Sequence, residues 1–333
     1  MRNNKNLYPR LIADIGGTNA RFSIETEPYK YEFTHVIESK NHLKLSDAIL
    51  SYLEEISLLD SVHHVALSVP SPMIDDILFM VNSPWHGQSM SEIRTEINMD
   101  STIFLNDFHA LALSIPHINK KKLVKVGGLL KANPDKPIAI IGPGTGLGMA
   151  TLIKNPMGGY LAIPAEGGRS SFPPVSDEEI ELWRFVHKRF SHVSAERFVS
   201  GPGIQLIYEA YCSIRGVQIK TLPTPAEITT KGVSGEDWLC RLSIDTFCRM
   251  LGTVASNLAV ITNSFGGVYI GGGIIPKILN YFLKSEFRSR FEDKGRYRPF
   301  LANMPIFVII DEFPAFLGAS YALDVYLNHG YIP

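Results

Sequence analysis

The sequence predicts an α/β protein built from two domains. Its 333 residues exceed the roughly 100 to 200 that a single domain usually holds. Residues 11–23 contain an apolar strand, a turn of glycine and threonine, and a second apolar strand, and residues 138–153 repeat this plan. Two such hairpins in one chain indicate a duplicated architecture, and two domains suggest a cleft between them.

The first third of the chain reads as strands with one helix. A helical pattern covers residues 45–56, and β-branched and aromatic runs predict the strands LIADI (11–15), ARFSIE (20–25), YEFTHVI (31–37), HHVALSV (63–69), ILFMVN (77–82) and TIFLND (102–107). Such residues resume within three positions of Thr18, where a Rossmann dinucleotide turn would begin a helix. The first glycines therefore join strand to strand.

Helices dominate much of the second half. A polar, Pro- and Gly-bearing stretch at 119–137 suggests a domain crossing, after which the hairpin of 138–153 follows. Ser176 with Glu179 predicts a capped helix, and Ser194 precedes a helix that should break at residues 201–203. The remaining expected elements are a long helix over 238–261, strands GGVYI (266–270) and MPIFVIID (304–311), and a closing helix over 315–328.

The composition favours a small soluble partner. Lys and Arg total 32 against 33 Asp and Glu, without blocks of like charge, so we expect neither nucleic-acid nor membrane binding. The cysteines Cys212, Cys240 and Cys248 match no zinc spacing and are expected to be reduced core residues. The N-terminal residues lack the apolar core of a signal peptide, which predicts a cytoplasmic location.

Both glycine turns suit phosphate binding. Turns without side chains leave backbone N–H groups open to phosphate oxygens, although glycine also serves simply to make a tight hairpin. The candidates are Gly16, Gly17 and Thr18 in the first turn and Gly144, Thr145 and Gly146 in the second. Asp14, just before the first turn, would face the phosphates through a divalent cation, with magnesium usually bound through water, or would cap the turn.

Four further polar residues lie where strands and loops end. Asn106 and Asp107 stand where a buried strand meets a helix, a position that points side chains into a cleft, although Asp107 would also serve as an N-cap. Glu166 and Glu196 have the chemistry to accept hydrogen bonds from sugar hydroxyls, or to be solvated or capping residues. The residues alone leave these alternatives open.

Taken together, the motifs carry a resemblance. DIGGTNAR, FLNDF, GPGTGLG, EGG, HVSAERFVSGPG, FGGVYIGGGIIP and FRSRFEDKGR occur in an order similar to bacterial glucokinases of the hexokinase and actin-like superfamily. The resemblance spans nearly the whole chain. It implies an α/β protein of two ribonuclease H-like domains with a cleft between them, a small domain of residues 1–118 and 313–333, a large domain of residues 119–312, and a homodimer.

The resemblance also implies the activity and the site. Asp107 would be the base in ATP-dependent phosphorylation of glucose to glucose 6-phosphate, with ATP and Mg²⁺ as cofactors. The sugar would contact Asn82, Asn106, Asp107, Glu166, Arg169 and Glu196. Asn82 and Trp85 match an asparagine and a tryptophan near the substrate loop of the family. The nucleotide would contact Asp14, Gly16, Gly17, Thr18, Gly144, Thr145, Gly146, Gly272 and Gly273. Asp14 would also be the residue that holds the metal. The alternative for Gly272 and Gly273 is a closely packed turn into a helix.

Arg169 departs from the family pattern. The family usually has histidine there, and imidazole can accept a hydrogen bond, whereas guanidinium only donates. The change leaves open a glucose kinase with altered affinity, a kinase for another hexose or an amino sugar, and a non-catalytic sugar or nucleotide sensor.

Overall fold

The computed structural model describes residues 7–80 and 83–333, and these divide into two compact units. The first unit takes in residues up to 119, 160–162 and 311–333, and the second takes in 120–159 and 163–310. The chain therefore returns to its first unit at the C-terminus.

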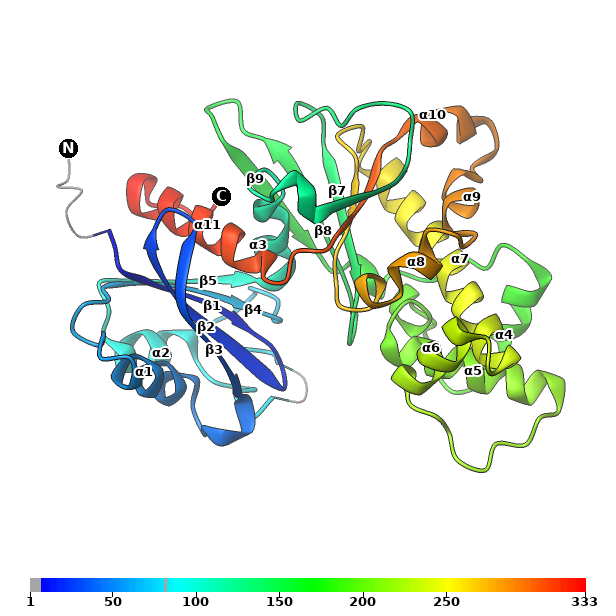
Figure 1. Cartoon of the computed structure of the whole chain (residues 1–333), viewed down its shortest axis with the longest axis horizontal. Helices are drawn as coiled ribbons and strands as arrows, with labels where there is room; N and C mark the ends of the chain where they lie inside the picture. The colour runs from blue at the N-terminus through cyan, green and yellow to red at the C-terminus, as the bar shows by residue number, and fades with distance from the viewer. Residues whose placement is uncertain (1–6, 81–82) are drawn as a thin grey trace. The chain divides into compact units, whose positions relative to one another are not determined.

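The first unit is a five-stranded sheet with helices on both faces. Its strand order is β3-β2-β1-β4-β5. The strands are β1 (Arg10–Ile15), β2 (Asn19–Glu27), β3 (Lys30–Glu38), β4 (His64–Val69) and β5 (Ser101–Asn106). Helices α1 (Leu45–Glu55) and α2 (Met90–Ile97) cover one face, and α3 (Asp107–Ser114) and α11 (Pro314–His329) cover the other (Figure 1).

The second unit repeats the order of the first sheet. Its six strands run β6-β11-β10-β7-β8-β9, so that β9-β8-β7-β10-β11 corresponds to β3-β2-β1-β4-β5. In each sheet the central hairpin is antiparallel and the next two pairings are parallel. The strands are β6 (Leu123–Gly127), β7 (Ile138–Pro143), β8 (Leu147–Lys154), β9 (Tyr160–Ala165), β10 (Val268–Ile270) and β11 (Ile306–Ile309). The duplication expected from the two hairpins is present.

Helix α7 (Trp238–Ile261) forms the centre of the second core. By length and composition it is the one helix of the described residues that would pass for a membrane span, and 72% of its most apolar window is buried inside the protein. Small residues let neighbours approach it: a Cβ at Gly252 would lie 2.6 Å from the carbonyl oxygen of Phe287. The other helices of this unit are α4 (Asp177–His187), α5 (Gly201–Arg215), α6 (Pro225–Ser234), α8 (Leu279–Phe282), α9 (Phe287–Glu292) and α10 (Arg298–Asn303). In Figure 1, α4, α5 and α6 gather around one end of α7.

The three cysteines are free and buried, as expected. Burial raises the pKa of Cys240 and of Cys248 to about 12 and raises the pKa of Cys212. At neutral pH these thiols remain protonated and behave as small apolar groups.

The motif FRSRFEDKGR has a structural role. The guanidinium of Arg288 donates to three carbonyl oxygens at 2.8–3.0 Å, those of Leu301, Ala302 and Met304. Arg290 Nη2 lies 2.6 Å from Oε1 of the fully buried Glu179. Both arginines thus fasten α9 to neighbouring segments.

Two sequence predictions of secondary structure were wrong. Residues 77–80 form one isolated bridge, Ile77 to Ser89, instead of a strand. Leu78 and Met80 are buried with the period of a strand, but Leu78 instead exchanges backbone hydrogen bonds with a local turn, through its N–H to Gln88 and its carbonyl to Gly87. Residues 81 and 82 lie outside the described part.

Residues 201–203 begin a helix rather than end one. Ser200 caps α5 by accepting a hydrogen bond from Gly203 N at 3.1 Å. Pro202 lies in the first turn, where its missing N–H costs no intrahelical bond. The preceding segment forms only a short 3₁₀ turn, Ala195–Arg197.

Candidate functional site

The first glycine turn connects β1 to β2. Gly16 N donates to Asn19 O at 2.8 Å, and Thr18 O accepts from Ser39 N at 2.9 Å. A Cβ at Gly16 would lie 2.8 Å from Asn19 O, so the tight turn itself requires glycine there. Thr18 is exposed at the tip, and Gly17 is partly exposed. The turn is both sterically constrained and open to an anion.

Asp14 lies opposite Arg21 on the hairpin. Their side chains form an ion pair, with Arg21 Nη1 3.1 Å from Asp14 Oδ2. Burial raises the pKa of Asp14, and the Arg21 charge opposes that shift. The carboxylate therefore pairs across the strands, while 24% of its side chain stays exposed. An incoming cation would relieve the cost of burying this charge.

The second turn is also closed by a glycine N–H, and it lies beside the start of a helix. Gly144 N donates to Gly146 O at 2.8 Å, and Gly144 O accepts from Gly201 N at 2.8 Å, at the N-terminus of α5. Among the described residues, no atom beyond the chain neighbours of Gly144 lies within 4 Å of where its Cβ would stand. The positive end of the α5 dipole beside this open turn favours an anion there. Sequence reasoning missed this helix terminus because it placed a helix break at the same residues.

The third glycine cluster packs against the second hairpin. Gly271 N donates to Ile141 O at 2.8 Å. Gly272 has a φ of +79°, and its Cβ would lie 2.3 Å from Pro143 O. A Cβ at Gly273 would have no atom within 4 Å from the described part of the chain, apart from its chain neighbours. Close packing thus explains why glycine is required at position 272. At Gly273 the space beside the backbone is open to a ligand.

Asn106 and Asp107 lie at the junction of β5 and α3. Asn106, rather than Asp107, is the N-cap: its Oδ1 accepts from Phe108 N at 2.9 Å and from His109 N at 3.3 Å. Asn106 Nδ2 donates to Ser71 O at 3.2 Å. Asp107 is the first helical residue and is half-buried. The capping bonds fix Asn106 and hold Asp107 at the positive end of α3.

Glu166, Arg169 and Glu196 form one charged cluster in the second unit. Arg169 Nε lies 3.4 Å from Glu166 Oε2, and Arg169 Nη1 lies 3.7 Å from Glu196 Oε1. Glu196 Oε2 accepts from Leu147 N at 2.9 Å, just after the second glycine turn. A Cβ at Gly146 would lie 2.6 Å from that oxygen, so glycine makes room for Glu196. The structure thus connects the carboxylates with the turn.

Comparison with known proteins gives a consistent result. The family model of glucokinase matches residues 11–325. The chain belongs to the glucokinase family. A glucokinase of Neisseria meningitidis serogroup B is 45% identical over 322 residues, covering 97% of both chains.

Solved structures agree with the family assignment. A glucokinase from an Antarctic psychrotroph is 30% identical, with a TM-score of 0.82 over 94% of this chain and 98% of the other. A ROK family glucokinase from Streptomyces griseus, in complex with glucose and AMPPNP, has a TM-score of 0.65 at 16% identity over 94% and 98%, which shows a shared fold. The resemblance and the two-domain actin- and hexokinase-like fold class read from the sequence are confirmed. A glucose kinase is favoured over a kinase for another sugar and over a sensor.

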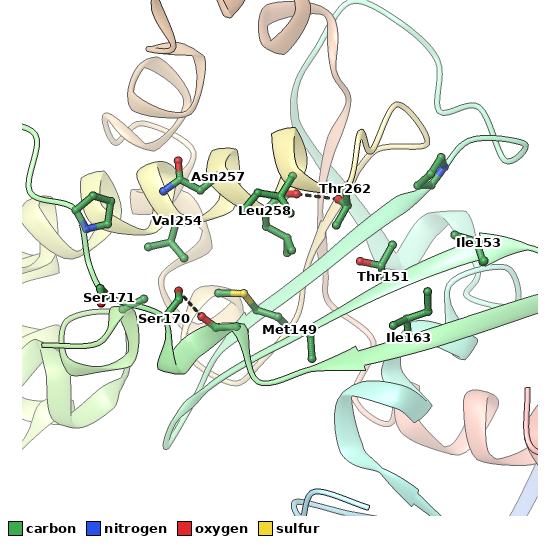
Figure 2. Close-up of a pocket in the computed structure, with 16 residues that line it drawn as sticks. Met149, Thr151, Ile153, Ile163, Ser170, Ser171, Val254, Asn257, Leu258 and Thr262 are labelled. Carbon is green, nitrogen blue, oxygen red and sulfur yellow. Dashed lines mark hydrogen bonds between the residues drawn. The ribbon is translucent and has the colours of Figure 1, made fainter. Parts of the chain in front are cut away.

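An apolar cavity of about 550 Å³ lies behind the loop that carries Glu166 in this glucokinase-family chain. Met149, Thr151 and Ile153 from β8 face Val254 and Leu258 of α7 across it (Figure 2). Gly167 and Ser170 close one end, where Ser170 Oγ donates to Gly167 O at 2.7 Å. Its walls are mainly apolar, and the polar side chains among them are those of Thr151, Ser170, Ser171, Asn257 and Thr262. No pattern in the sequence indicated this cavity.

Two residues near the expected substrate loop have different outcomes. Asn82 lies outside the described residues, so its predicted contact with the sugar remains a prediction. Trp85 is fully buried and donates through Nε1 to His42 O at 3.1 Å, which makes it a core residue.

Proposed function

We propose that this member of the glucokinase family transfers the γ-phosphoryl group of ATP to the 6-hydroxyl of glucose. The observation that carries the proposal is the repeated Gly-Thr hairpin at corresponding positions of the two sheets, each with an exposed threonine at its tip. In the Streptomyces griseus protein of the same fold, glucose and AMPPNP are bound together. The product would be glucose 6-phosphate, as in the first step of glycolysis, formed in the cytoplasm.

The glycine turns would hold the nucleotide. Gly17 and Thr18 in the first turn, and Thr145 and Gly146 in the second, would donate backbone N–H groups to phosphate oxygens. Gly16 and Gly144, whose own N–H groups close the two turns, would let the phosphates approach because they carry no side chain. The space around Gly144 and Gly273 fits the approach of a ligand to the backbone. Gly272 and Gly273 would lie beside the adenosine, as the family resemblance implies. The N-terminus of α5 adds a favourable dipole.

The donor set around Asp14 fits Mg²⁺ held mainly by phosphates and water. No group of three or more His, Cys, Asp or Glu side chains suited to a metal occurs among the described residues. Magnesium commonly binds through one or two carboxylates together with substrate phosphates. When bound, the ion would neutralise charge on the transferring phosphoryl group, and Asp14 would orient its water shell.

Asp107 would act as the base. As the O6–P bond forms and the bond from the γ-phosphorus to the bridging oxygen of ADP breaks, the O6 proton passes to the Asp107 carboxylate. Asn106 would orient the sugar from its position as the N-cap of α3. Glu166 and Glu196 would accept hydrogen bonds from ring hydroxyls. Arg169 and Asn82 would complete the sugar contacts.

We extend the proposal to the organisation of the enzyme. A small domain of residues 1–118 and 313–333 would carry Asp107 and the first turn, and a large domain of residues 119–312 would carry the second turn and the glutamates. The protein would act as a homodimer, as the family resemblance implies.

The test is ADP release with Mg-ATP and glucose. We expect turnover by the wild-type enzyme and a fall of about a hundredfold or more for Asp107→Asn, with glucose binding retained in calorimetry. Asp100→Asn, an exposed carboxylate of the same unit, is the control and should keep full turnover. Undiminished turnover of Asp107→Asn would exclude it as the base, and absence of wild-type turnover would overturn the proposed function.

A further inference from the structure

Arg169 lies between two carboxylates whose charges would otherwise add. Its Nε faces Glu166 Oε2 at 3.4 Å and its Nη1 faces Glu196 Oε1 at 3.7 Å. These distances exceed the roughly 2.7–2.9 Å of a strong charge-assisted hydrogen bond. The guanidinium therefore offsets charge without saturating the carboxylate oxygens, which keep lone pairs for hydroxyl donors.

The backbone under Arg169 is fixed. His192 Nε2 donates to Arg169 O at 2.8 Å, and Arg169 N donates to Glu166 O at 3.0 Å. The loop also packs against β8, since a Cβ at Gly168 would lie 2.1 Å from Leu147 O. A well-held backbone limits where the guanidinium can reach, even though 67% of the Arg169 side chain is exposed.

The carboxylate oxygens of Glu166 and Glu196 differ in how freely a ligand can reach them. Glu196 uses Oε2 for the N–H of Leu147 and turns Oε1 toward Arg169. Glu166 is more open, with 59% of its side chain exposed. A ligand that reaches both carboxylates thus meets a guanidinium donor beside each, and the cluster of three side chains carries a net charge of about −1 rather than −2 at neutral pH.

We propose that Arg169 is a specificity residue that favours sugars bearing hydroxyl groups over sugars bearing an ammonium group at the position facing this cluster. The inference rests on the proposed function of Glu166 and Glu196 as sugar ligands. A hydroxyl donates to a carboxylate and also accepts from the guanidinium, so it satisfies both neighbours. An ammonium group only donates, and it is repelled by Arg169.

The experiment compares glucose with glucosamine. Steady-state kcat and KM are measured for both sugars with the wild-type enzyme and with Arg169→Gln, Arg169→Lys and Arg197→Gln. Arg197 belongs to the same 3₁₀ turn as Glu196, but its guanidinium lies over the Phe190 ring at 3.7 Å, which makes it a matched control. Calorimetric binding of both sugars without nucleotide gives the same preference independently of turnover.

We expect Arg169→Gln to raise the glucosamine-to-glucose ratio of kcat/KM about five- to tenfold, mainly through KM. Removing an exposed guanidinium charge about 4 Å from the ammonium group of the sugar changes the binding constant by that order. Arg169→Lys and Arg197→Gln should keep the ratio within about twofold of the wild type. An Arg169→Gln ratio within that range would overturn the inference, as would an equal change in Arg197→Gln.

Failure of the proposed function is distinguishable from failure of this inference. If the wild-type enzyme releases no ADP with any sugar, the kinase assignment fails, and the calorimetric ratio still decides the role of Arg169. If glucose turns over and the ratio does not respond to Arg169→Gln, the kinase assignment stands and the specificity role is wrong.

Discussion

Arg10 and Asp324 form an ion pair across 314 positions of sequence, with Arg10 Nη1 2.5 Å from Asp324 Oδ1. Arg10 is fully buried, and its Nε also contacts the fully buried Glu25 at 2.5 Å. Because Asp324 lies on α11 and Arg10 on β1, this network fastens the C-terminal helix to the first strand of the unit. The first unit therefore depends on a segment from the far end of the chain.

Arg10→Met should destabilise the first unit by about 3–5 kcal/mol, because Glu25 would remain buried without its cation. Hydrogen exchange of β1 and α11 amides, followed with urea unfolding, measures the loss. Lys30→Met is the control, since the ion pairs of Lys30 with Glu27 and Glu32 are exposed and its loss should go undetected. Equal stability of Arg10→Met and the wild type would show that the network contributes specificity alone.

Gly318→Ala should cost about 3 kcal/mol. A Cβ at Gly318 of α11 would stand 1.7 Å from Ala110 O of α3, so the two helices would have to separate. The measurement is the free energy of unfolding, with exchange rates on α3 and α11. Unchanged exchange on both helices would mean that this contact adjusts without loss of packing.

Gly144→Ala should affect the nucleotide and leave folding intact. The open space around Gly144 leaves room for a methyl group, so stability should stay within about 0.5 kcal/mol of the wild type. If phosphates approach this turn, loss of one hydrogen bond to a charged group would raise KM for ATP about tenfold or more. An unaltered KM for ATP would place the phosphates elsewhere.

The architecture was predictable where the pattern is periodic and local. The hairpin strands around Gly16 and Gly144 and the long helix over 238–261 follow from alternation and helical spacing, and each is present. Residues 77–80 alternate in burial like a strand, yet within the described residues they pair only through the bridge from Ile77 to Ser89. Strand pairing is a tertiary property that alternation alone does not determine. The start of α5 was misread because glycine and proline serve both as helix breakers and as first-turn residues.

The sequence predicted which residues belong to the site better than it predicted which of them are in contact. The family resemblance named Glu166, Glu196 and Arg169, but the two contacts of Arg169 depend on side chains from separate loops. In the same way, Asn106 took the capping role expected of Asp107, because only the backbone path decides which residue precedes the first helical turn.

His117 should make the first unit less stable in mild acid. Its ring lies between those of Tyr29 and Tyr321, at centroid distances of 5.0 and 4.9 Å, and Nε2 is buried without a hydrogen-bond partner among the described residues. Burial lowers the pKa of His117 below its usual 6.5, against the opposing charge of Asp324. The unfolded chain then binds more protons than the folded one below pH 6.5, so stability falls as the pH drops through and below that value.

His117→Phe keeps an aromatic ring between the two tyrosines and removes the titrating group. We expect a smaller loss of unfolding free energy between pH 7.5 and pH 5 than in the wild type, measured by urea unfolding at fixed ionic strength. Part of the slope should persist, because burial also lowers the pKa of His109, whose ring contacts Pro333 O. An identical slope in His117→Phe and the wild type would assign the acid sensitivity to other groups, and His109→Gln in the same series would show how much belongs to His109.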